Sequence, residues 1–227
     1  MSARARPAAL ALGGIRLSPL NWANGVKLAE VHERNREWLG VWEATSEREP
    51  PRGSRTAMMR SYWGYVARAR REMGAGTALP WVIEVDRNVV GHVVIGQIAG
   101  VPSWSGTLGY WVDRDHTGRG IAPAAAALAV DFAIGAVGLH RVEAAIHPDN
   151  TRSLAVVAKL GFREEGVRRR YLHVRGVWTD HRIFAFTRED APEGLVDRWR
   201  QVVVAGRREP EVDRKQEGPA SNVGTGP

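Results

Sequence analysis

The sequence contains no cysteine among its 227 residues. Disulfide bridges, a thiol nucleophile, cysteine-ligated zinc and thiolate clusters are therefore excluded. The absence of cysteine is also consistent with a reducing compartment, and we expect a cytoplasmic protein. No apolar run reaches the roughly 18 residues of a membrane-spanning helix, because Asp131 and Gly135 interrupt the richest stretch, residues 121–139. We therefore expect no membrane partner.

Lysine is nearly absent: it stands only at Lys27, Lys159 and Lys215, although Lys and Arg together number 32 against 25 Asp and Glu. Arginine thus carries nearly all of the positive charge, and it keeps that charge at any physiological pH. The arginines are spread along the chain, so RNA contact is expected only as an incidental property. The densest basic run, residues 168–170 (RRR) with Arg175, is compatible with a nearby polyanionic ligand.

The composition, 44% hydrophobic and 25% charged, is typical of a globular protein. The hydrophobic pattern alternates between the periods of strands and helices, which predicts a mixed α/β layered domain. Strands are predicted at residues 15–20, 79–86, 89–98, 106–113, 141–147, 162–174 and 177–187, helices at 22–38, 56–73, 120–137, 151–160 and 193–205, and a loop at 47–55. We expect an N-terminal extension over 1–14, one domain over 15–190, a C-terminal helix over 191–206 and a disordered tail over 207–227.

The clearest local signal for a ligand is a predicted strand that is followed by Gly118, Gly120 and a helix. Such a junction leaves the first backbone N–H groups of the helix unpaired, and glycine lets an anion approach them without a Cβ in the way. Pro123 falls in the first helical turn, where its missing N–H costs little. On these glycines alone, a plain strand-to-helix turn is the alternative. Walker and Rossmann loops are excluded, because no Lys-Ser/Thr follows and the three spaced glycines are missing.

Four short segments together resemble the GNAT superfamily of acetyl-CoA-dependent N-acetyltransferases: residues 118–122 (GRGIA), 147–153 (HPDNTRS), 159–162 (KLGF) and 165–166 (EG). A second set of residues resembles the RimJ/RimL type within it, the ribosomal-protein alanine N-acetyltransferases. These residues are Asn35, Arg36, Trp42, Glu43, Tyr171, Gly176, Trp178, Asp180 and His181. The resemblance covers residues 15–189, which is most of the chain.

The resemblance implies a GNAT fold: a mixed, mostly antiparallel twisted sheet flanked by helices, with a splayed strand pair that holds CoA. It implies acetyl-CoA as co-substrate and no metal. The pyrophosphate would bind the backbone N–H groups of residues 117–122, which we call the glycine loop. The pantetheine arm would run beside the preceding strand. The implied cofactor-binding residues are Tyr110, Trp111, Val112, Thr117, Gly118, Arg119, Gly120, Ile121, Ala122, Asn150 and Ser153.

The resemblance also implies Ser153 and Tyr171 as the catalytic residues that serve the departing thiolate, although water could take this role. Asn150 fits a helix N-cap equally well, since it directly precedes a predicted helix. The identity of the general base is not decided by the resemblance. Some relatives carry an acidic residue where this chain has Arg170, so Glu43, Glu165 and His181 remain as candidates, Glu165 being the one expected to pair with an arginine instead.

The acceptor is an amine, with Asn35, Trp42, Glu43 and Trp178 implied as its binding residues. A protein α-amine has a pKa near 7.8 and a lysine side chain one near 10.4, so the α-amine supplies far more neutral nucleophile at neutral pH. Without a recognisable strong base, the sequence therefore favours a protein N-terminus, in particular that of a ribosomal protein. A small-molecule amine acetyltransferase and a non-catalytic CoA- or ribosome-binding module are the alternatives.

Overall fold

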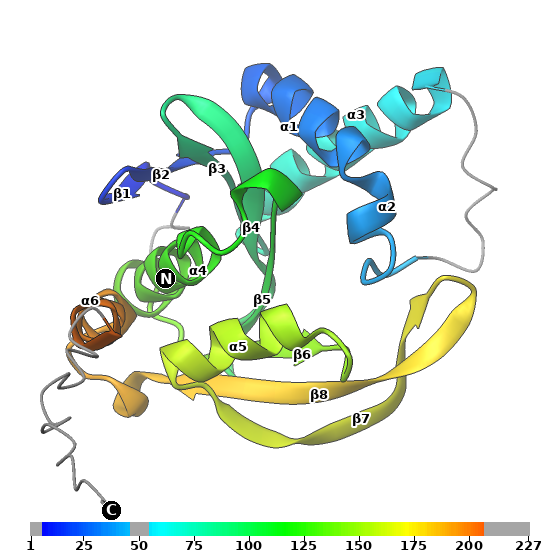
Figure 1. Cartoon of the computed structure of the whole chain (residues 1–227). Coiled ribbons are helices and arrows are strands. Elements are labelled where there is room, and N and C mark those ends of the chain that lie inside the picture. The colour runs from blue at the N-terminus through cyan, green and yellow to red at the C-terminus, as the bar shows by residue number, and fades with distance from the viewer. Residues whose placement is uncertain (1–5, 46–54, 207–227) are drawn as a thin grey trace, which may run out of the picture.

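The computed structural model describes residues 6–45 and 55–206 (Figure 1). The predicted disordered tail, nearly all of the predicted loop at 47–55 and the first five residues lie outside them. The described residues form one eight-stranded sheet in the order β1-β2-β3-β4-β5-β6-β8-β7. Its strands are β1 Leu10–Leu12, β2 Ile15–Pro19, β3 Leu79–Val85, β4 Asn88–Ala99, β5 Ser105–Val112, β6 Arg141–Ile146, β7 Arg163–Val174 and β8 Val177–Thr187.

Helices cover both faces of this sheet (Figure 1). They are α1 Trp22–Arg34, α2 Arg36–Leu39, α3 Arg55–Ala75, α4 Ile121–Phe132, α5 Thr151–Leu160 and α6 Leu195–Gly206. A large core lies where α4, α5 and α6 pack on the sheet, and α4 buries a run of alanines, Ala124–Ala127 among them. A smaller core under α1 and α3 contains Leu20, Leu28 and Val82. The mixed α/β architecture predicted from the sequence is confirmed.

The pairing of β5 with β6 differs from every other pairing in the described sheet. All other neighbours are antiparallel, whereas β5 and β6 are parallel and pair over residues 105–107 and 141–143. Beyond these positions the two strands diverge, so the remaining part of β5 has a backbone edge that β6 does not reach. The predicted mostly antiparallel sheet with a splayed strand pair is present.

Two local features differ from the sequence predictions. The single helix expected over 22–38 is broken at Asn35, whose φ of −100° and ψ of 8° end α1 and lead into α2. Residues of the expected N-terminal extension form β1, which turns back through Gly13 (φ +58°) and pairs with β2. Leu10 and Leu12 pack on the large core, which explains why this short strand forms.

Candidate functional site

A cavity of about 310 Å³ opens where β5 and β6 diverge. It is bounded by the second half of β5, the end of β6, the first turn of α5 and the α2 region. Its lining includes Trp38, Leu39, Trp42, Glu43, Leu108, Gly109, Tyr110, Trp111, Val112, Thr117, Ala122, Ala144, Ala145, Ile146, His147, Asn150, Arg152, Ser153, Val156, Leu172 and His181. The cavity therefore brings together residues that the sequence placed in three separate motifs.

The glycine loop lies between the end of β5 and the start of α4. Gly118 (φ +77°) and Gly120 (φ +74°) both adopt the left-handed conformation, which glycine takes without the penalty that other residues incur. Gly120 is the N-cap of α4 and supplies no side chain to its first N–H groups. The helix thus begins with unsatisfied donors and the positive end of its dipole, which is the arrangement that binds phosphate.

The glycine loop is tied to the end of α1 through Asp113, which is only 2% exposed. Asn35 Nδ2 donates to Asp113 Oδ1 (2.8 Å), Arg34 forms an ion pair with the same carboxylate, and Asn35 Oδ1 accepts from the Arg114 backbone N–H (2.9 Å). Burial opposes ionisation of Asp113, but hydrogen bonds from Arg34 and Asn35 outweigh it and hold its pKa below the ordinary value.

Asn35 consequently has a different place from the acceptor contact expected of it. Its side chain is 3% exposed, it also donates to the Val31 carbonyl (2.9 Å), and it does not line the cavity. With both of its polar atoms bonded to protein, it supports the glycine loop from behind the cavity wall. These contacts are those of a residue that positions the glycine loop, and the acceptor contact of Asn35 stays a prediction.

Asn150 and Ser153 lie together at the start of α5. Asn150 Oδ1 accepts from the Ser153 backbone N–H (3.1 Å), so Asn150 is the N-cap that the sequence allowed as an alternative. The Tyr110 hydroxyl donates to the Ser153 carbonyl (3.2 Å) and joins β5 to this helix start. Ser153, Asn150 and Tyr110 all line the cavity, and burial raises the pKa of Tyr110, which keeps its hydroxyl protonated.

The wall formed by the α2 region is aromatic and carries one carboxylate. Arg152 and Arg114 lie over the Trp38 ring, with Cζ 4.4 Å and 5.7 Å from its centroid. Glu43 contacts His32 closely and faces the cavity. Cation–π contacts of this kind stabilise the position of a half-buried ring, so Trp38 forms a stable part of the wall.

The opposite wall ends in two histidines, His147 after β6 and His181 in β8. Their rings are 5.8 Å apart and perpendicular, and the Trp42 ring lies 5.6 Å from His147. Tyr171 reaches His181 (6.2 Å between centroids) because a bulge in β7 between Arg168 and Leu172 redirects it. Trp42 and the two histidines line the cavity, whereas Tyr171 borders it through His181.

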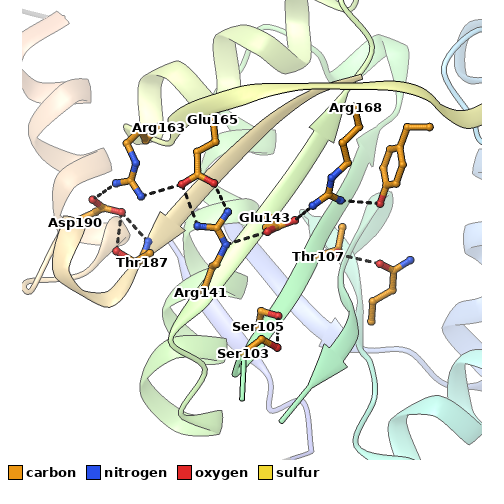
Figure 2. A network of polar contacts seen from close by, with 12 residues as sticks. Ser103, Ser105, Thr107, Arg141, Glu143, Arg163, Glu165, Arg168, Thr187 and Asp190 are labelled. Carbon is orange, nitrogen blue, oxygen red and sulfur yellow. Dashed lines mark hydrogen bonds and ion pairs between the residues drawn. The ribbon is translucent and has the colours of Figure 1, made fainter. Parts of the chain in front are cut away.

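Two of the remaining sequence candidates lie away from the cavity. Trp178 is 49% exposed and stacks edge-on with His173 (5.6 Å) near the β7–β8 turn. Glu165 accepts from Arg141 (3.0 Å) and Arg163 (3.0 Å) in the ion-pair network of Figure 2, which lowers its pKa to about 2. The expectation that Glu165 pairs with an arginine is confirmed, and its place outside the cavity argues against Glu165 as the proton acceptor.

Among the polar and aromatic residues that line the cavity, Trp38, His147 and Arg152 had no site role predicted from the sequence. His147 and Arg152 stand inside a motif that supported the resemblance, but their chemical types alone gave no site. Trp38 carries no sequence signal, because its position depends on the break of α1 at Asn35. The signal that could have found His147 is its place directly after a strand, since strand ends meet at the splay.

Comparison with known proteins defines the class. The family model described as acetyltransferase (GNAT) domain matches residues 16–163, which is more than half of the chain. The chain therefore belongs to the GNAT acetyltransferase family, in agreement with the splayed sheet and the glycine loop.

Individual relatives indicate which members of this family the chain resembles. The structure of Mycobacterium smegmatis RimJ in complex with CoA-disulfide is 36% identical, with a TM-score of 0.76, over 85% of this chain and 90% of that one. The ribosomal protein uS5-alanine N-acetyltransferase of Escherichia coli is 25% identical and matches 74% of this chain and 84% of its own length. The probable N-acetyltransferase YjcK of Bacillus subtilis is 37% identical over 105 residues, 46% of this chain and 58% of its own length. The chain thus spans little more than half of this last relative.

Proposed function

We propose that this protein transfers the acetyl group of acetyl-CoA to the N-terminal α-amine of a protein. The observation that carries the proposal is the cavity at the β5–β6 splay, whose lining includes Thr117 and Ala122, which flank the glycines of the loop, and the aromatic wall. A ligand with an anionic group and a thioester matches these two parts of the lining. The family membership and the CoA in the related RimJ structure support the same reaction.

The residues present fit acetyl-CoA. The N–H groups of the glycine loop, residues 117–122, bind the pyrophosphate, and the backbone of Tyr110–Val112 pairs with the pantetheine arm as a neighbouring strand would. A backbone N–H at this edge stabilises the charge that develops on the thioester oxygen during attack. Ser153 faces the same cavity and donates a proton to the departing thiolate.

The choice of an α-amine rests on the acceptor end. Trp42, Glu43 and the two histidines leave an apolar space with one carboxylate, which suits a small N-terminal residue whose amine is partly neutral near pH 7.5. Two related enzymes are named as alanine acetyltransferases of a ribosomal protein, and their names support a protein acceptor. A small-molecule amine and a non-catalytic CoA-binding module remain as the outcomes against which it is tested.

The decisive experiment incubates the full chain with acetyl-CoA and a panel of acceptors. The panel contains a peptide with free N-terminal alanine, the same peptide with a blocked N-terminus and one free lysine, and several small amines. We expect acetylation of the α-amine, located by mass spectrometry, with kcat/KM rising between about pH 6.5 and 8.5 as the amine deprotonates. Acetate on lysine or on a small amine alone would refute the acceptor, and no CoA release with any acceptor would refute catalysis.

A further inference from the structure

His147 and His181 occupy facing positions where β6 and β8 reach the cavity. The pairing of β6 with β8 ends at Ile146 and Arg182, and the rings of the two residues next to this pair, His147 and His181, lie 5.8 Å apart. By the alternation of side chains along β8, His181 shares the sheet face of Arg141 and Glu143, whose ion pairs are drawn in Figure 2. This is the side of Trp42, where the acceptor end of the cavity lies.

The hydrogen bonds fix different tautomers for the two rings. His181 Nδ1 lies 3.2 Å from the Thr179 carbonyl oxygen, which only accepts, so this nitrogen carries the proton. Its Nε2 is then a free lone pair in the neutral ring, and no side chain in the described part of the protein donates to it. His147 is the reverse: its Nδ1 accepts from the Asp149 backbone N–H (3.2 Å), which leaves the proton on Nε2.

The surroundings favour the neutral form of His181. His181 is only 3% exposed. Burial lowers the pKa of its ring below the ordinary value, and His147 acts in the same direction. The bond to Thr179 and the charge of Asp180 oppose this and are outweighed. The titratable and charged groups around it are His147 from β6, Tyr171 and Arg168 from β7, Asp180 from its own strand, and Glu43 and Arg152 across the cavity.

We propose that His181 is the general base of acetyl transfer, with Nε2 accepting the proton that the attacking amine loses. The inference rests on the proposed acetyl transfer but not on the acceptor class. The amine nitrogen forms the bond to the acetyl carbon, and the carbon–sulfur bond breaks with its electron pair on sulfur. One amine proton passes to His181 Nε2 and then to solvent, while the thiolate takes a proton either from water or from Ser153, which regains one from solvent.

The two carboxylates considered from the sequence are less suited to this role. Glu165 is held by two arginines outside the cavity. Glu43 faces the cavity, but its carboxylate is in close contact with His32 and is therefore engaged in an ion pair or hydrogen bond. His181 combines a position in the cavity with an unoccupied proton acceptor, and this combination separates it from the alternatives.

The test compares His181→Asn, His181→Ala, Glu43→Gln and His140→Asn, using whichever amine of the panel the parent protein acetylates. Asparagine keeps an N–H donor for the Thr179 carbonyl but has no basic atom, so a structural role would survive this change. His140 is 53% exposed, pairs with Glu189 and serves as the matched surface control. Acetyl-CoA affinity, the Tm and kcat are measured for each variant.

We expect His181→Asn to lower kcat at least about 100-fold with the acetyl-CoA Kd within twofold of the parent and His140→Asn unchanged. Added imidazoles should restore part of the rate of His181→Ala, more strongly as their pKa rises, which only a lost base explains. A kcat of His181→Asn within threefold of the parent, or a large loss confined to Glu43→Gln, would overturn the proposal. Activity on a small amine alone would refute the α-amine acceptor while leaving this comparison valid.

Discussion

Gly118 and Gly138 both adopt a left-handed backbone conformation, at two different places in the chain. Their φ angles are +77° and +85°, and a Cβ on either would meet no atom within 4 Å. Gly118 lies in the glycine loop, whereas Gly138 follows the short π-helix Ala133–Val137 that comes after α4. The pair therefore separates the cost of a left-handed residue from the cost of blocking an anion.

We expect Gly118→Ala and Gly138→Ala to lose a similar amount of stability, roughly 1 kcal/mol. Only Gly118→Ala should weaken acetyl-CoA binding, by about fivefold or 1 kcal/mol, because its methyl group occupies space next to the N–H donors. Calorimetry gives both affinities, and thermal unfolding gives both stabilities. Equal affinities in the two variants would place the pyrophosphate elsewhere. Gly120 is a poorer choice, since its Cβ would also meet Trp199 at 3.2 Å.

His181 marks the limit of sequence reasoning at this scale. The sequence offered it as one of three candidate general bases, because histidine is a suitable residue type. No other feature of the sequence distinguished among the three candidates. The decision needs the register that brings His147 opposite His181 and the backbone carbonyl that holds one ring nitrogen. Register is a property of paired strands, so a single strand's pattern does not contain it.

Among the elements, the strands β2 to β8 were predictable, whereas β1 and the junction after α1 were not. The seven predicted strands correspond to β2 to β8, with boundaries within about two residues. The periodicity that continues past Asn35 hid the break there, because the break is caused by a buried partner far along the chain. That partner, Asp113, fixes α1 to the end of β5.

This junction makes a testable contribution to stability. Asp113 has a folded pKa below its ordinary value of about 3.9, so the charged carboxylate stabilises the fold above that pH and the contribution is lost as pH falls through the folded pKa. We expect Asp113→Asn to lower the free energy of unfolding by about 1–3 kcal/mol at pH 7. The difference from the parent should shrink below about pH 4 in urea titrations. A difference independent of pH would show that packing, not charge, is responsible.

At the scale of the whole molecule, the splay means that the free protein carries an incomplete sheet. A ligand that fills it binds the folded chain alone and stabilises it, by about 2.7 kcal/mol when present at 100 times its Kd. We expect acetyl-CoA to raise the Tm by several degrees in differential scanning fluorimetry. Trp199→Ala should reduce this shift, because the ring packs against Gly120 of the glycine loop. Trp22→Ala, at a 44% exposed tryptophan in α1, should leave it unchanged.

The membrane and metal predictions concern the whole molecule as well. Within residues 6–45 and 55–206, no helix is both long and apolar enough to cross a membrane. The same residues contain no group of three or more His, Asp or Glu side chains arranged to hold a metal ion.

The contact between α6 and Gly120 affects the order in which the surroundings of the glycine loop are completed during synthesis of the chain. Asp131 accepts from the backbone N–H groups of Leu195 (2.7 Å) and Val196 (2.9 Å) and so fixes the start of the helix that carries Trp199. The glycine loop leaves the ribosome well before this helix does, since chains emerge from their N-terminus at about 5–20 residues per second. A nascent chain thus holds its glycine loop without the wall that Trp199 provides, and it acquires that wall only after α6 is synthesised.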